Sequence, residues 1–140
     1  MGKVTARAQR TIAAAADRVR AALADYETVR PKILTEHYRD YRVEEGGRVH
    51  WTLQATKSRV RDQLVEVSED AGQIVERDTN SSMVTTWTVA PASAESSTVT
   101  VETSWTGASG IGGFFERTFA PKGMQRIHDG VLANLEQSLR

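Results

Sequence analysis

Hydrophobic and polar residues follow two different periods along this 140-residue chain. Between His37 and Thr106, apolar residues recur at every second position in a succession of short segments, which indicates β-strands with one apolar and one polar face. Over residues 13–26 and 124–139, apolar residues recur every three or four positions, as on an amphipathic helix. The pattern therefore predicts an antiparallel sheet whose apolar face is covered by helices.

The order of the expected elements follows from these periods. A first strand covers residues 4–12, and an alanine-rich run over 13–26 predicts a short helix, with another turn or two over 28–34. Six strands are then expected, at His37–Glu45, Arg48–Ser58, Val60–Ser68, Gln73–Asp78, Ser82–Ala90 and Thr98–Thr106. The last element is a long helix over Met124–Leu139. We expect the α+β class, with a curved seven-stranded sheet around this helix in a single domain of residues 1–140.

Composition narrows the class of protein. With 39% hydrophobic and 26% charged residues, the chain has the make-up of one ordinary globular domain. Cysteine is absent, so neither disulfides nor thiolate metal sites are expected. No run approaches the roughly 18 apolar residues of a membrane span, and the N-terminus lacks the apolar core of a signal peptide. We expect a cytoplasmic protein without an integral membrane segment.

Charge is balanced overall but unevenly distributed. Residues 1–61 carry thirteen basic and seven acidic side chains, whereas residues 62–140 carry five and eleven. Packing of the two halves against each other would compensate these charges. No basic tail or aromatic RNA-binding motif accompanies the basic half, so a nucleic-acid partner is not expected.

The segment SWTGASGIGGFFERTFAP, residues 104–121, invites comparison with phosphate-binding loops. A Walker-type loop needs Lys and Ser or Thr after its last glycine, but Gly112 is followed by Gly113 and Phe114. A dinucleotide-binding fingerprint would need a third glycine where Phe115 stands. We expect instead that the glycines turn the chain and that Phe115 and Phe119 cap one end of the interior. This cap is either a gate or a fixed corner.

Polar residues near the expected interior give only weak evidence for a catalytic or metal-binding site. His37, His50 and His128 lack the spacing of metal ligands, so neither a metal nor another cofactor is expected. His128 lies on the apolar face of the last helix. It is either an acid or base in a pocket or an ordinary core residue. In HYRDYR, alternation places Tyr38 and Asp40 on one strand face and Tyr41 on the other. These side chains either supply an acid/base pair to a common pocket or form a row of polar groups on the surface of the sheet.

Arg10 shares the apolar side of the first strand. Burial of a lone charge is costly, so we expect Arg10 to be paired or exposed.

The chain resembles the SRPBCC superfamily, which includes START-type lipid-binding domains and birch-pollen-allergen proteins. TARAQRTIAAAADRVRAALADYETV resembles the opening strand and first helix of that superfamily. YRDYRVEEGG and GIGGFFERTFAP are most similar to an actinobacterial polyketide cyclase/dehydrase-like branch. The resemblance implies a helix-grip fold, with a sheet gripping the C-terminal helix around a cavity for hydrophobic molecules.

Three functions are compatible with this resemblance. We expect non-covalent binding of a small hydrophobic molecule, such as a lipid or polyketide-like compound, for transport or sensing. The expected cavity walls are Trp51, Leu53, Met83, Trp87, Val101, Trp105, Phe115, Phe119, Met124 and His128. The first alternative is a cyclase or dehydrase that uses His128 with Asp40 or Tyr38 as acid and base. The second is an interaction module with a filled core, and a homodimer is left open.

Overall fold

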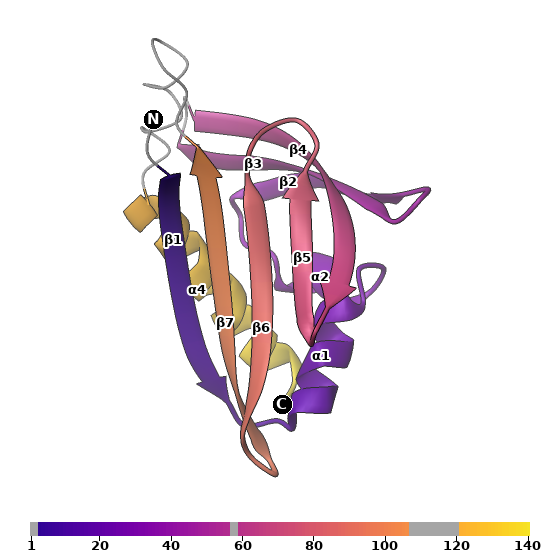
Figure 1. Ribbon diagram of the computed structural model, residues 1–140, viewed down its shortest axis with the longest axis vertical. Coiled ribbons are helices and arrows are strands. Elements are labelled where there is room, and N and C mark those ends of the chain that lie inside the picture. Colours follow the sequence, from indigo (N-terminus) through magenta and orange to yellow (C-terminus); the bar gives the residue numbers. More distant parts are fainter. Residues whose placement is uncertain (1–2, 57–58, 107–120) are drawn as a thin grey trace.

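The computed structural model describes residues 3–56, 59–106 and 121–140. Seven strands form one antiparallel sheet in the order β1-β7-β6-β5-β4-β3-β2. Their bounds are β1 Lys3–Ile12, β2 Tyr38–Glu44, β3 Arg48–Thr56, β4 Arg59–Asp70, β5 Gln73–Asp78, β6 Val84–Ser93 and β7 Ser96–Thr106. Strands β2 to β7 form a meander, and the N-terminal strand β1 joins its far end beside β7 (Figure 1).

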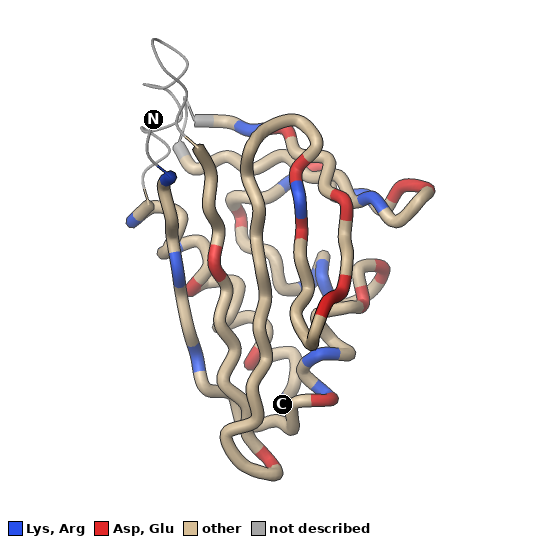
Figure 2. The backbone as a smooth tube through the Cα atoms, viewed as in Figure 1, with Lys and Arg blue, Asp and Glu red and all other residues tan. Residues whose placement is uncertain are grey.

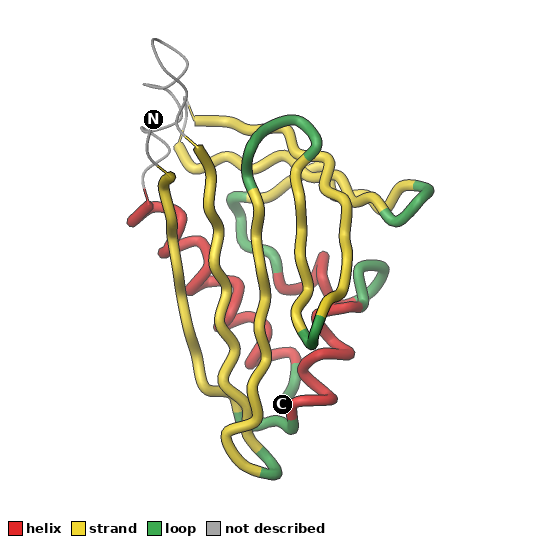
Figure 3. The backbone as a smooth tube through the Cα atoms, in the orientation of Figure 1, coloured by secondary structure: helices red, strands yellow, loops and turns green. Residues whose placement is uncertain are grey.

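The described helices all lie on one face of this sheet (Figure 3). They are α1 Ala16–Ala24, α2 Val29–Ile33 and the long α4 Pro121–Ser138. Helix α4 runs behind β1 and β7, and α1 and α2 cover the sheet nearer to β5 (Figure 1). The apolar stripe of α4 is buried, as its spacing predicted. This architecture confirms the predicted α+β helix-grip fold.

Two predicted boundaries were wrong. Helix α1 begins at Ala16 rather than Ala13, because Ala15 has the extended backbone of an N-cap residue (φ −61°, ψ 148°). The loop expected between Ala90 and Ser97 is largely strand, since β6 and β7 stay paired to within two residues of each other. The side chains of Ser93 and Ser96 are hydrogen-bonded at 2.8 Å across that tight turn.

The core lies between the sheet and the helices and contains the three tryptophans. Trp51, Trp87 and Trp105 are 7%, 3% and 1% exposed, so the prediction that all three point to the inner side is confirmed. One cluster of buried residues surrounds Trp87, and a second surrounds Trp51 and Trp105. Tyr26 and Tyr38 pack against both clusters and therefore lie where they meet.

Helix α4 lies close to the chain that follows α2. The side-chain amide of Asn134 donates to the carbonyl of Ile33 at 2.9 Å. One turn earlier, a Cβ atom added to Gly130 would lie 2.9 Å from Cγ2 of Thr35, closer than atoms pack. A larger residue at position 130 would therefore force the Thr35 side chain or the helix to move.

Charged residues of the N-terminal half, residues 1–61, pair with charged residues of the C-terminal half, residues 62–140. Arg10 on β1 lies 2.9 Å from Glu136 on α4, which confirms that Arg10 is paired. Arg30 pairs with Glu76, and Arg48 lies 3.7 Å from Glu66. Figure 2 shows blue and red segments spread over several strands and helices rather than gathered on one element. No described helix is long and apolar enough to cross a bilayer.

Candidate functional site

A small cavity of about 20 Å³ lies between the inner face of the sheet, α2 and α4. That volume is about what one water molecule requires. The cavity combines aromatic, sulfur-containing and polar side chains. It is lined by Arg30, Leu34, Tyr38, Trp51, Gln63, Glu76, Met83, Thr85, Trp87, Met124, His128 and Val131. The site described below is built from these residues and their partners.

A buried ion pair forms the polar centre of the site. Arg30 Nη2 on α2 lies 2.6 Å from Glu76 Oε2 on β5, and the two side chains are 4% and 3% exposed. Glu76 also accepts hydrogen bonds from the hydroxyl of Tyr26 at 2.6 Å and from the indole of Trp87 at 3.1 Å. Arg30 donates a second bond to the carbonyl of Leu23 at 3.0 Å. The carboxylate is therefore satisfied by three donors, which come from α2, β6 and the turn between α1 and α2.

The guanidinium of Arg30 is also held between two rings. It lies 4.5 Å from the ring centre of Tyr26 and 4.8 Å from that of Trp87, distances typical of cation–π contacts. Burial is the largest single influence and opposes the charge of Arg30, but the charge and hydrogen bond of Glu76, together with Tyr26 and Tyr41, outweigh it and raise the pKa above its ordinary value. Burial, followed by the negative charge of Glu76, also raises the pKa of Tyr26. Arg30 thus stays a cation and Tyr26 stays a neutral donor.

His128 enters the site from α4. Its Nε2 atom lies 2.7 Å from Oγ1 of Thr103 on β7, which in turn lies 2.7 Å from Oγ1 of Thr85 on β6. The ring meets Trp87 edge-on, with ring centres 6.5 Å apart. Burial lowers the pKa of His128 to about 4, although Glu76 acts in the opposite direction. The imidazole is therefore neutral at neutral pH.

A bulge in β2 brings two tyrosines to the same side of the sheet. The pairing of β2 with β3 shifts register between Arg39 and Arg42, and Asp40 has a left-handed backbone with φ 55°. Tyr38 and Tyr41 both contact Trp51, Tyr38 edge-on at 6.1 Å and Tyr41 stacked at 6.3 Å between ring centres. The prediction that Tyr38 and Asp40 share a face opposite Tyr41 was wrong, because the extra residue of the bulge reverses the alternation.

The same bulge moves Asp40 away from the interior. Its side chain is 64% exposed, 3.9 Å from Arg39, and does not line the cavity. Tyr38, by contrast, lines the cavity together with His128. Of the three acid/base candidates considered from the sequence, the structure brings together Tyr38 and His128 but not Asp40.

The expected wall residues fall into three groups. The first lines the cavity and consists of Trp51, Met83, Trp87, Met124 and His128. The second, Leu53, Val101 and Trp105, is buried in the core but is not part of the cavity lining. Phe115 and Phe119, together with the expected glycine-rich cap, lie outside the described residues.

Sequence analysis missed the buried pair and its partners. Ile74, Glu76 and Asp78 occupy every second position of β5, and all three are buried. A glutamate in phase with a buried isoleucine, together with Arg30 between apolar residues of a short helix, was the available signal. Gln63 was also missed; it accepts a hydrogen bond from the Trp51 indole at 2.8 Å and donates to the sulfur of Met83 at 3.3 Å.

The arrangement can bind polar and apolar groups side by side. Two buried nitrogens, Arg30 Nε and His128 Nδ1, have no hydrogen-bond partner within the described part of the chain. Both belong to side chains that line the cavity. Among the described residues, no group of His, Asp and Glu side chains could hold a metal ion.

Comparisons with known structures find the same fold in several proteins. The KanY protein, determined by NMR, is 51% identical, with a TM-score of 0.87 over 99% of this chain and 98% of KanY. TTHA0849 from Thermus thermophilus is 22% identical, with a TM-score of 0.76 over 96% of this chain and 95% of that one. The Zhui aromatase/cyclase from Streptomyces sp. R1128 is 16% identical, with a TM-score of 0.73 over 99% and 97%.

A search of curated proteins gave no match. Family models, however, give a match over nearly the full length, since the family described as polyketide cyclase/dehydrase and lipid transport matches residues 3–140. The sheet that grips α4, the cavity between them and this match agree with the predicted superfamily. The chain belongs to the polyketide cyclase/dehydrase and lipid transport family.

Proposed function

We propose that the protein binds a small, mainly hydrophobic molecule carrying at least one oxygen group, in the interior between the sheet and α4. The observation that carries this proposal is a pair of buried nitrogens, Arg30 Nε and His128 Nδ1, which have no hydrogen-bond partner among the described residues and belong to side chains that line the cavity. A buried polar atom without a hydrogen bond costs about 1–3 kcal/mol. A hydroxyl or carbonyl oxygen of a ligand would recover part of that cost.

Binding requires the interior to widen, because a cavity of about 20 Å³ holds little more than one water molecule. Met83 and Met124 lie on its walls, and methionine is the apolar residue that repacks most readily around a new shape. Membership of a family whose description names cyclases, dehydrases and lipid transport supports an occupant of this chemistry.

Decan-1-ol is a suitable first probe, since it joins an alkyl chain to one hydroxyl. With methyl-labelled methionine, its titration should shift the Met83 and Met124 signals saturably. Val131→Phe should abolish these shifts, because it adds a ring beside the cavity lined by Val131. Val43→Phe, which adds the same ring at a 36% exposed position, is the matched control and should bind normally. Methionine signals that do not change with the probe would instead favour an interaction module with a filled core. Equal binding by Val131→Phe would place the probe outside the interior and contradict the proposal.

A second candidate function is acid/base catalysis, favoured by one observation. Tyr38 and His128 line the same cavity, and His128 is neutral at neutral pH. A neutral imidazole can accept a proton from the carbon between two carbonyls, while a phenol stabilises the enolate oxygen. The test is deuterium exchange at that carbon of ethyl 3-oxohexanoate. Exchange faster than in buffer, and slowed to the buffer rate by His128→Gln, would support catalysis. Exchange at the buffer rate with the unmodified protein would contradict catalysis and leave ligand binding as the proposed function.

A further inference from the structure

Three side chains form a continuous hydrogen-bonded chain from the sheet to α4. Oγ1 of Thr85 on β6 lies 2.7 Å from Oγ1 of Thr103 on β7, which lies 2.7 Å from Nε2 of His128. Thr85 and His128 line the interior cavity, whereas Thr103 is fully buried and is not part of the lining. We call these three residues the Thr–His relay. Both ends of the relay therefore belong to the cavity, and its middle member holds them together.

Each hydroxyl group has one proton, so the Thr–His relay can run in only two directions. Burial lowers the pKa of His128 to about 4, so the ring is neutral at neutral pH and only one of its nitrogens carries a proton. If Thr103 donates to Nε2, the ring proton must be on Nδ1. If Thr103 donates to Thr85 instead, Nε2 must donate to Thr103, and Nδ1 keeps a free lone pair. The direction of the relay thus decides what His128 offers at Nδ1.

Arg30, which lines the same cavity, favours the second direction. Its Nε atom always carries a proton, and neither this nitrogen nor Nδ1 of His128 has a hydrogen-bond partner among the described residues. With the ring proton on Nδ1, two buried donors would lack an acceptor; with the proton on Nε2, only one does. Buried N–H groups without a partner are rarer in proteins than buried acceptors without one. The last proton is then carried by Thr85, which is partly exposed. A relay that runs from His128 through Thr103 to Thr85 therefore has the lower cost.

This direction leaves a donor on Arg30 and an acceptor on His128, a combination that matches a hydroxyl group, which both accepts and donates. A carbonyl oxygen only accepts, so it would pair with Arg30 and leave Nδ1 of His128 unpaired. The cavity of about 20 Å³ is about the size of one water molecule, so an oxygen atom bound there meets both side chains. We propose that Thr103 is a positioning residue that makes the interior select a ligand hydroxyl group over a carbonyl group. This inference rests on the proposed binding function and names the group that the site recognises.

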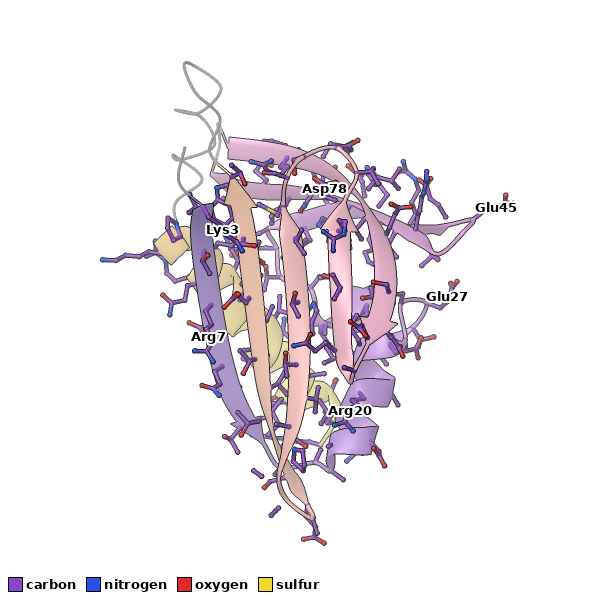
Figure 4. The ribbon with its side chains drawn as sticks, in the orientation of Figure 1. Lys3, Arg7, Arg20, Glu27, Glu45 and Asp78 are labelled. Atoms are coloured by element: carbon purple, nitrogen blue, oxygen red, sulfur yellow. The ribbon has the colours of Figure 1, made fainter. Side chains whose placement is uncertain are left out.

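The first measurement is the tautomer of His128 in the full chain at neutral pH. Nitrogen NMR shifts separate a protonated from an unprotonated ring nitrogen, and His128→Gln identifies the signals. We expect Nε2 to be protonated and Nδ1 unprotonated. Thr85→Val removes the acceptor of the Thr103 proton, so Thr103 should then donate to Nε2 and the ring proton should move to Nδ1. The matched control is Thr100→Val on the outer face of β7, where Thr100 lines one hollow with Arg7 of β1 (Figure 4). It should leave the tautomer unchanged.

The second measurement compares decan-2-ol with decan-2-one, two probes that differ only in the hydroxyl and the carbonyl group. Titrations followed by the methyl signals of Met83 and Met124 should show about fivefold tighter binding of the alcohol, which corresponds to one hydrogen bond of about 1 kcal/mol. Thr85→Val should bring the two affinities together, because Nδ1 of His128 then donates to either probe. Thr100→Val should keep the ratio.

Failure of this selection can be told from failure of binding itself. A proton on Nδ1 of His128 in the unmodified protein, or equal affinities for the two probes, would overturn the selection and leave the proposed binding function standing. A tautomer or a ratio that Thr85→Val does not change would do the same. Should Thr85→Val fail to fold, the tautomer and the affinity ratio of the unmodified protein still decide. If neither probe shifts the methionine signals, the proposed binding function fails, and the selection of a hydroxyl group fails with it.

Discussion

His50 on β3 holds the bulge of β2 by its backbone: Nδ1 lies 2.8 Å from the carbonyl oxygen of Asp40. On the other side of the ring, Nε2 lies 2.6 Å from a carboxylate oxygen of Asp62 on β4. Both partners are hydrogen-bond acceptors, so the His50 ring links the backbone of β2 to the side chain of Asp62 on β4. The bond from His50 also lowers the pKa of Asp62. A histidine on the outer face thus fixes the backbone that turns Tyr38 and Tyr41 inward.

His50→Leu should therefore loosen the inner wall. The change removes both hydrogen bonds, and we expect the free energy of unfolding to fall by about 2 kcal/mol. Contacts between the rings of Tyr41 and Trp51 should weaken at the same time, which nuclear Overhauser effects can follow. His37→Leu is the matched control, since the ring of His37 bonds to Thr35, two residues away, and to no other residue that the structure describes. Unchanged ring contacts in His50→Leu would show that the bulge holds itself.

Glu76→Gln should be strongly destabilising. The substitution leaves the cation of Arg30 buried without its counter-charge, a loss of about 3–5 kcal/mol in comparable pairs. Replacing both residues, as Arg30→Met with Glu76→Leu, removes the buried charge and should recover part of that loss. Urea unfolding of Arg30→Met, of Glu76→Leu and of the double variant gives the coupling energy. A double variant as unstable as the sum of the single variants would rule out a coupled pair.

Stability should fall below neutral pH through His128. Its pKa is about 4 in the folded protein against 6.5 as the ordinary value, so the unfolded chain binds the proton more readily. The loss should begin near pH 6.5, continue to about pH 4 and reach about 3 kcal/mol. His128→Gln should remove this part of the pH dependence, and His37→Gln should keep it. Equal slopes for His128→Gln and the unmodified protein between pH 6.5 and 4 would contradict the assignment.

Ala71→Asn should stabilise the fold. Ala71 has φ 50° and is followed by Gly72 with φ 81°, the conformation for which asparagine followed by glycine is preferred in two-residue hairpin turns. Relief of this strain should add about 1 kcal/mol to the free energy of unfolding. Ala94→Asn, in the turn between β6 and β7 where φ is not positive, should bring no gain. Thermal melts of both variants decide, and equal melting temperatures would refute the assignment of strain to Ala71.

Much of the fold could be predicted because the period of two leaves a clear trace in sequence. Each tryptophan points to the face that alternation gives it, since its strand is regular around it. The face of Asp40 could not be predicted, because the bulge depends on His50, ten positions further along the chain and on another strand. Arg30 and Glu76 are 46 positions apart, and their pairing depends on how α2 packs against β5. Local patterns carry no information about such distant contacts.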